Sequence, residues 1–281
     1  MMTLNQISGI ARSLSFKHPT NRAIIIIVAS VFPFVTLVRL VAGDTPLASI
    51  VWAFSAAVAI FFAWAISREL NPDSNASAFI SVALMLPTLF YIAQPTLLVL
   101  FWLLVITRIL NRITGRTIKP VDLAVAMILS VILSWQELWL YCLITGLVLF
   151  ANSWMGKQHK KGIVLLVIIL SLGVVSILLG DTPFKMIEIS MYTIIISTLL
   201  TLLFMPVIFT RTKIKSLTDT TKEPISVSRM VLTRITAVVT AMLVAILQGN
   251  SGFYDLLPLW TSIGGIIIWN IYERITSRRK N

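Results

Sequence analysis

The chain has 281 residues, of which 57% are hydrophobic and only 12% are charged. A soluble domain carries about 25% charged residues, and its apolar residues do not come in long blocks as they do here. The composition excludes a soluble globular fold. In a membrane protein, the net charge of +12 indicates basic cytoplasmic loops rather than a nucleic-acid-binding surface.

The first 21 residues are of mixed character. Apolar residues recur at helical spacing beside two cations, Arg12 and Lys17, and this pattern predicts a short amphipathic helix at the cytoplasmic interface. The apolar positions are Leu4, Ile7, Ile10, Ala11 and Leu14. A disordered tail is the alternative. No cleavable signal peptide is expected, because the first apolar run is too long for one.

Apolar runs of membrane-spanning character fill residues 22–272, which form a single transmembrane domain. Backbone polar groups in lipid must be satisfied within each segment, and the runs do not alternate as barrel strands do, so we predict an all-α polytopic protein. We expect ten spans. They cover 23–42, 47–66, 77–92, 95–110, 121–134, 137–154, 162–180, 184–209, 229–248 and 255–272.

Two long apolar stretches are each divided into a pair of spans. A single helix over 78–110 would be about 50 Å long, against a hydrocarbon core of about 30 Å. Pro95 also disfavours helix at Gln94, the residue before it. The same length argument divides 121–154 at Ser134 to Glu137.

The distribution of cations supports this division. With both termini inside, 21 of the 23 lysines and arginines fall on the cytoplasmic side, and only Arg39 and Lys185 fall outside. The positive-inside rule therefore favours ten spans with cytoplasmic termini, in a prokaryotic plasma membrane. The polar segment 210–228 has few large apolar residues, and we expect a mobile cytoplasmic loop there.

The tetrapeptide GDTP occurs twice, at Gly43 to Pro46 and at Gly180 to Pro183. Glycine suits the end of one helix, aspartate or threonine caps the next, and proline suits its first position, so each copy predicts a tight turn between helices. "NRITGR" and "ERITSR" repeat in the same order. The two echoes suggest parallel repeats, 22–116 and 162–279, with the fifth and sixth spans inserted between them.

Charges inside a membrane are candidates for function, because burying them costs several kcal/mol. On the outer side, we expect a substrate-binding vestibule if the first, seventh and eighth spans adjoin; snorkelling and helix capping are the alternative. Its residues are Arg39, Asp44, Asp181, Lys185 and Glu188.

On the inner side, "RELNPDSN" is the densest polar stretch. Its structural interpretation is a turn in which Arg68 ends one helix and Asp73 or Ser74 caps the next. Its functional interpretation is a cytoplasmic polar cluster beside lipid phosphates, able to hold a divalent ion. That cluster comprises Arg68, Glu69, Asp73 and Asp122.

The sequence predicts no resident cofactor, metal site or catalytic residue. The single cysteine, Cys142, allows no disulfide within the chain. The phosphate-binding loop, the zinc-protease helix and the serine elbow have no counterpart among its motifs.

These features leave three functions open. The first is a secondary transporter or permease for a small neutral or lipid-like solute. The second is a non-catalytic subunit or assembly factor of a membrane complex. The third is a membrane-embedded enzyme acting on lipid-linked substrates at the cytoplasmic face. The expected partners are the bilayer, anionic lipid headgroups on the cytoplasmic side, and a membrane-protein partner or a second copy, with no nucleic acid.

Overall fold

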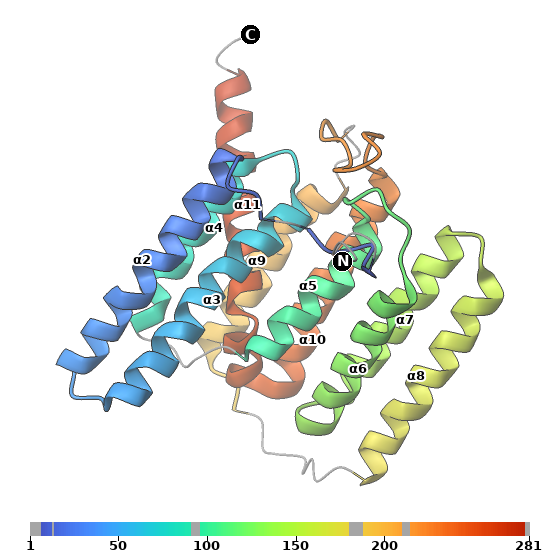
Figure 1. The fold of residues 1–281 in the computed structure, drawn as a ribbon, viewed down its shortest axis with the longest axis horizontal. Helices are drawn as coiled ribbons and strands as arrows, with labels where there is room; N and C mark the ends of the chain where they lie inside the picture. Colours follow the sequence, from blue (N-terminus) through green and yellow to red (C-terminus); the bar gives the residue numbers. More distant parts are fainter. Residues whose placement is uncertain (1–6, 13, 91–95, 180–187, 210–213, 279–281) are drawn as a thin grey trace.

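The structure is a computed structural model that describes residues 7–12, 14–90, 96–179, 188–209 and 214–278. These residues form α-helices and one short 3-10 helix (Figure 1), so the prediction of an all-α fold is confirmed. The elements are α2 (Pro19–Val41), α3 (Pro46–Leu70), α4 (Asn75–Met85), η1 (Leu86–Phe90), α5 (Leu97–Asn111), α6 (Pro120–Gln136), α7 (Leu140–Met155), α8 (His159–Leu179), α9 (Met191–Phe209), α10 (Val227–Asp255) and α11 (Leu257–Arg278).

Helix α5 occupies the centre of the bundle and packs against α3, α6, α7 and α10. Figure 1 shows α2 and α8 at opposite edges: α2 packs along α3, and α8 packs on α6 and α7. Helix α4 lies against α3 and α11. The arrangement is a bundle of neighbouring, mostly antiparallel helices; some are joined by short turns, and longer segments connect α5 to α6 and α9 to α10.

Both long apolar stretches are divided into separate helices. Helices α4 and α5 are separate, and α6 ends at Gln136 before α7 begins at Leu140. Helix α4 tightens into the 3-10 helix at Leu86, next to Pro87. Proline has no N–H to donate to the preceding turn, so the α-helical hydrogen bonding stops there.

The first GDTP segment forms the predicted tight turn between α2 and α3. Gly43 has a φ of +97°, Thr45 caps α3 by accepting a hydrogen bond from the Ala48 N–H, and Pro46 is the first helical residue. Glycine reaches this left-handed conformation without the steric cost that a Cβ would impose. The second GDTP segment lies outside the described residues.

Small residues allow α3, α4 and α11 to approach closely. A Cβ added to Gly265 in α11 would lie 2.3 Å from the Ser81 Oγ of α4. The Ser262 hydroxyl of α11 donates a 2.8 Å hydrogen bond to the Ala63 carbonyl of α3. Close contact through glycine, alanine and serine is typical of helix packing in membranes, where hydrophobic exclusion between helices is weak.

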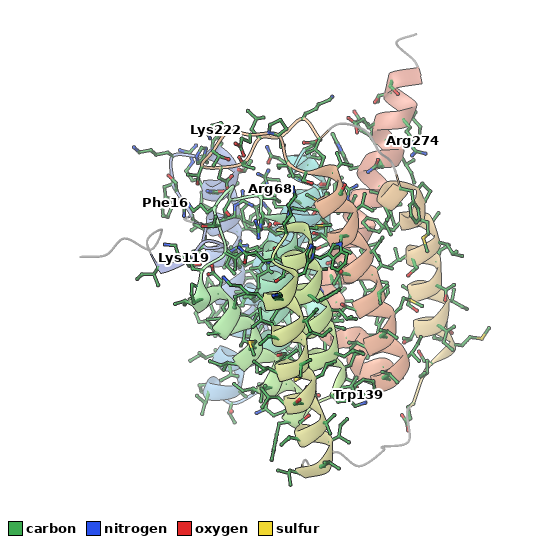
Figure 2. All side chains as sticks on the ribbon, turned by 90° about the vertical axis from the view of Figure 1, so that its right-hand side faces the viewer. Phe16, Arg68, Lys119, Trp139, Lys222 and Arg274 are labelled. Carbon is green, nitrogen blue, oxygen red and sulfur yellow. The ribbon has the colours of Figure 1, made fainter. Side chains whose placement is uncertain are left out.

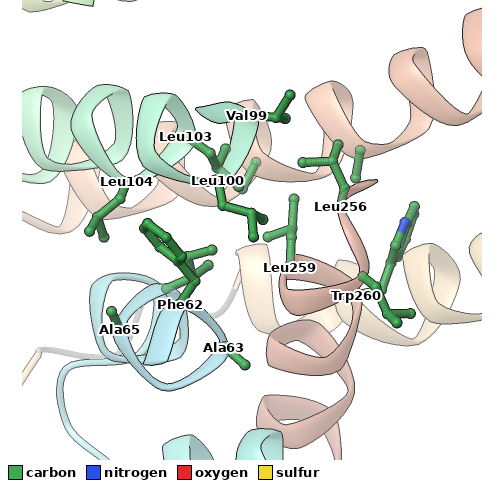
Figure 3. Packing of buried hydrophobic residues seen from close by; sticks show 14 of the residues in the cluster. Phe62, Ala63, Ala65, Val99, Leu100, Leu103, Leu104, Leu256, Leu259 and Trp260 are labelled. Carbon is green, nitrogen blue, oxygen red and sulfur yellow. The ribbon is translucent and has the colours of Figure 1, made fainter. Parts of the chain in front are cut away.

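Larger apolar side chains fill the centre of the bundle. Figure 3 shows Phe62 of α3 close to Leu100, Leu103 and Leu104 of α5. On the other side of α5, buried Trp102 donates a 2.8 Å hydrogen bond to the Thr145 hydroxyl of α7. Its polar N–H is therefore satisfied although the ring is buried.

Five described helices are long and apolar enough to cross a membrane: α2, α3, α8, α9 and α10. In the most apolar window of α2, only 17% of the residues are buried, against 67% in α3. An exposed apolar face of this extent is unsuited to water. These helices are compatible with a multi-pass membrane protein.

The structure describes parts of the two connecting segments for which the sequence predicts an amphipathic helix and a mobile loop. Residues 8–12 and 14–18 are irregular, and the Ile10 side chain is buried. In the described part of the 210–228 loop, the Asp219 and Thr220 N–H groups donate to the carbonyls of Ile113 and Thr114. In both segments, polar groups form hydrogen bonds with other connecting segments, and the sequence pattern does not reveal these partners.

Candidate functional site

One end of the bundle carries many of the cations, and we call it the basic end. Figure 2 shows Arg68, Lys222 and Arg274 towards this end and Trp139 at the opposite end. The N-terminal segment 7–18, the segment 112–119 between α5 and α6, and the segment 214–226 before α10 meet there. The contacts between these segments surround the last turn of α3.

Glu69, in that last turn, is the central charge of the basic end. Only 1% of its side chain is exposed. The Arg108 Nε donates to one carboxylate oxygen at 2.9 Å, and the Asn111 amide donates to the other at 2.8 Å. A buried carboxylate is tolerated only with such partners, because desolvation of the charge is costly.

Arg12 provides a second cation for Glu69 and joins it to the loop before α10. Its guanidinium lies 3.2 Å from the Glu69 carboxylate and 2.8 Å from that of Asp219. Burial opposes the charged form, but attraction to the two carboxylates outweighs it and raises the pKa of Arg12 above its ordinary value. Arg12 is therefore a fixed positive charge at this position.

Asp122 and Asp73 hold chain segments in place. The Asp122 carboxylate accepts hydrogen bonds from the Ser8 hydroxyl and from the Gly9 and Lys119 N–H groups. The Asp73 carboxylate accepts from the N–H groups of Lys215 and Ser216, at 3.0 and 2.7 Å. These two aspartates position the N-terminal segment and the 214–226 segment around Glu69.

A cavity of about 700 Å³ lies between the N-terminal segment, α3, α5 and the 214–226 segment. Five cationic side chains and two carboxylates line it: Arg12, Arg68, Arg108, Arg116 and Lys222, with Glu69 and Asp219. Positive charge is therefore in excess. Arg68 makes no hydrogen bond or ion pair with the described part of the chain, so its guanidinium is available to a ligand.

The walls of the cavity below these charges are apolar. They include Phe61, Trp64, Phe101 and Leu104, contributed by α3 and α5. Phe101 is 44% exposed at the surface of the bundle. A cationic mouth above aromatic and aliphatic walls suits an amphiphile with an anionic head, because the guanidinium fork matches phosphate oxygens and the walls match a hydrocarbon chain.

The four residues of the predicted inner cluster do not all lie at one site. Arg68 and Glu69 both line the cavity, whereas Asp73 and Asp122 do not. Asp73 does not cap α4; the cap is Ser74, which accepts from the Ser77 N–H. Among the residues that the structure describes, no three histidine, cysteine or acidic side chains lie close enough to hold a metal ion. The expectation of a divalent ion shared by these carboxylates therefore finds no support in their arrangement.

Of the predicted outer residues that the structure describes, Arg39 and Asp44 lie together and Glu188 lies apart from them. Arg39 and Asp44 form an ion pair of 2.5 Å, and the Arg39 guanidinium lies 4.1 Å from the centre of the Trp52 ring. Glu188 is exposed just before α9, where its carbonyl accepts from the Asn250 N–H. Asp181 and Lys185 lie outside the described residues. Since α2 and α8 lie at opposite edges of the bundle, the helices expected to adjoin at this vestibule are apart (Figure 1).

The residues that sequence reasoning missed are Arg12, Arg108 and Asn111. The two arginines were counted only among the cytoplasmic cations, and Asn111 was considered only as the first residue of the repeated motif NRITGR. A usable signal existed: Glu69 falls near the inner end of a predicted span, where a carboxylate needs cationic partners, and the inner end of another span carries an arginine.

No protein-family model, curated protein or solved structure matches this chain. The proposals that follow rest on its own geometry and chemistry.

Proposed function

We propose that the protein is a multi-pass plasma-membrane permease for a lipid-like solute with an anionic, phosphate-bearing head. The observation that carries this proposal is the cavity at the basic end, where five cations meet an aromatic and aliphatic wall. This charge favours an anionic head over the neutral solute that the sequence also allowed. The substrate head would bind at Arg68, and its chain would lie along α3 and α5.

In this proposal all ten helices enter or cross the membrane, with both termini and the basic end in the cytoplasm. The concentration of lysines and arginines near that end supports this orientation through the positive-inside rule. The shorter helices α5, α6 and α7 have 15, 17 and 16 residues. At 1.5 Å per residue they extend about 22–26 Å, close to the thickness of the hydrocarbon core.

The parallel repeat stays a prediction. Under exact duplication, α8 and α9 would correspond to α2 and α3. Helix α2 packs along α3, whereas α8 packs on α6 and α7 and α9 packs on α10 and α11. The permease proposal does not depend on the repeat, because the cavity is formed by α3, α5 and the connecting segments.

The lipid-enzyme alternative is less well supported at this site. General acid–base catalysis needs a carboxyl group with access to the reacting atoms. Glu69 is engaged by Arg12, Arg108 and Asn111, and Asp219, the other carboxylate of the cavity, is paired with Arg12. Asp73 and Asp122 do not line the cavity and accept hydrogen bonds from backbone N–H groups. The carboxylates therefore have structural partners that explain their positions.

Proteoliposomes provide the test. The full chain is reconstituted with a trace of phosphatidylglycerol or phosphatidylcholine, each carrying a fluorescent acyl chain, and movement between leaflets is followed by quenching with dithionite. We expect faster movement of phosphatidylglycerol, at least a fivefold loss of that rate in Arg68→Gln, and normal rates in Arg274→Gln. Binding without movement would overturn the permease proposal and favour a lipid-dependent subunit of a complex.

A further inference from the structure

A second group of arginines lies outside the cavity, where α5, α7 and α10 meet. Arg112 donates from Nε and Nη2 to the Asn152 side-chain oxygen, at 3.2 and 2.9 Å. Arg229 donates from Nη1 to the same oxygen at 3.2 Å and to the Leu110 carbonyl at 3.0 Å. Two guanidinium groups thus converge on one neutral oxygen atom.

This convergence lacks a counter-charge within the described part of the chain. Neither Arg112 nor Arg229 forms an ion pair there, whereas Arg12, Arg39 and Arg108 all do. Two like charges near one point repel each other, and burial lowers the pKa of Arg112 below its ordinary value. The positive end of the α10 dipole adds to the same field, since Arg229 lies in the first turn of that helix.

The donors of this group match an anion better than an amide. The Nε and Nη2 edge of a guanidinium fits two oxygens of one phosphate, but here both N–H groups share a single oxygen. Arg112 and Arg229 are both half-buried, so each keeps access to the surface, while Asn152 is buried. Arg112 ends α5 in a left-handed conformation, with a φ of 50°, rare for a residue with a Cβ.

We propose that Arg112, Asn152 and Arg229 form an anion-binding site for a phosphate group, distinct from the cavity. None of the three lines that cavity. The phosphate belongs either to an anionic lipid headgroup at the cytoplasmic interface or to a free phosphate ion. In both cases the ligand supplies the negative charge that the described residues do not provide to Arg112 and Arg229. It thereby stabilises the junction of α5, α7 and α10.

The test measures thermal unfolding of the purified full chain in a neutral detergent. Inorganic phosphate is compared with chloride at matched pH and ionic strength, and nanodiscs of phosphatidylglycerol are compared with nanodiscs of phosphatidylcholine. We expect one of the two anionic probes to raise the Tm by about 2–4 °C. A response to inorganic phosphate identifies a free anion, and a response to phosphatidylglycerol alone identifies a headgroup. Absence of both responses would overturn the proposal.

Substitutions assign the response to this site. Arg229→Gln should remove the response to inorganic phosphate and this site's share of a response to phosphatidylglycerol, whereas Arg274→Gln, an equal loss of charge on an exposed part of α11, should leave both intact. Arg68→Gln should keep the share that Arg229→Gln removes and lose only the share of a phosphatidylglycerol response that comes from the cavity, which separates this site from the proposed permease cavity. An equal response in Arg229→Gln and Arg274→Gln would contradict the assignment.

Asn152→Asp gives a result that unfolding alone cannot mimic. The new carboxylate would lie between the two guanidinium groups and supply the negative charge that the bound anion provides in the wild type. We expect this variant to melt at a higher temperature than the wild type in chloride and to lose its response to the anionic probe. A lower Tm with the response retained would refute the site.

Discussion

The Arg108 guanidinium of α5 donates a 2.9 Å hydrogen bond to the buried Glu69 carboxylate of α3. This contact joins two helices separated in sequence by α4 and η1. Arg12 and Asn111 complete the set of partners of Glu69, so one carboxylate connects the N-terminal segment, α3 and α5. The wall of the cavity that these elements form depends on that connection.

Replacing Glu69 with alanine should lower the free energy of unfolding by about 3 kcal/mol or more, because removing one partner of a buried ion pair leaves the remaining charge without compensation. The measurement is thermal or denaturant unfolding in neutral detergent. Glu273→Ala on the exposed surface of α11 is the matched control and should change little. Equal effects of the two substitutions would show that Glu69 is not the centre of a network.

Replacing Gly9 with alanine should release the N-terminal segment. A Cβ at this position would lie 2.1 Å from the Thr117 carbonyl oxygen, a backbone atom that cannot rotate away. We expect faster hydrogen exchange over residues 8–12 and weaker binding of anionic lipid, because Arg12 loses its position. Ser8→Ala removes only the neighbouring hydroxyl that donates to Asp122 and should have a smaller effect. Unchanged exchange in Gly9→Ala would contradict the close approach.

Replacing Asp73 with asparagine should loosen the 214–226 segment. The carboxylate accepts two backbone N–H groups, and hydrogen bonds to a charged acceptor contribute about 1.5–3 kcal/mol each. Hydrogen exchange at Lys215 and Ser216 should increase while the melting temperature of the helices changes little. A Mg²⁺-dependent activity lost in Asp73→Asn would instead support the enzyme alternative.

Replacing Arg39 with glutamine should have a small effect on stability and none on lipid movement. Its ion pair with Asp44 is part-exposed, and such pairs contribute about 0–1 kcal/mol, with a similar contribution from the cation–π contact to Trp52. Transport assays on Arg39→Gln and Arg68→Gln distinguish the two ends of the bundle. A larger loss of transport in Arg39→Gln than in Arg68→Gln would favour the outer vestibule as the substrate-binding site.

The helices were predictable because their signals are local. The length limit of a span correctly predicts that α4 and α5 are separate helices, and the glycine, threonine and proline of the first GDTP segment each perform the expected role in its turn. The N-terminal segment was not predictable in this way. Its apolar spacing suggests a helix, but the pairing of Ser8 and Gly9 with Asp122, more than 100 residues away, decides its path.

The candidate site was predictable only as a set of charges. Arg68 and Glu69 were identified because they lie together in one polar stretch. Arg68 has no partner in the described part of the chain, whereas the Glu69 carboxylate is buried and paired with Arg12 and Arg108 from other parts of the chain. Sequence spacing does not reveal such tertiary pairing, and the convergence of Arg112 and Arg229 on Asn152 illustrates the same limit.

The most direct test of the central claim is equilibrium binding of phosphatidylglycerol and phosphatidylcholine to the detergent-purified chain, measured by native mass spectrometry. The cavity predicts at least a tenfold preference for phosphatidylglycerol in the wild type and in Arg274→Gln. Arg68→Gln should lose most of that preference while keeping the wild-type melting temperature. An unchanged preference in Arg68→Gln would contradict the assignment of the cavity as the lipid-binding site.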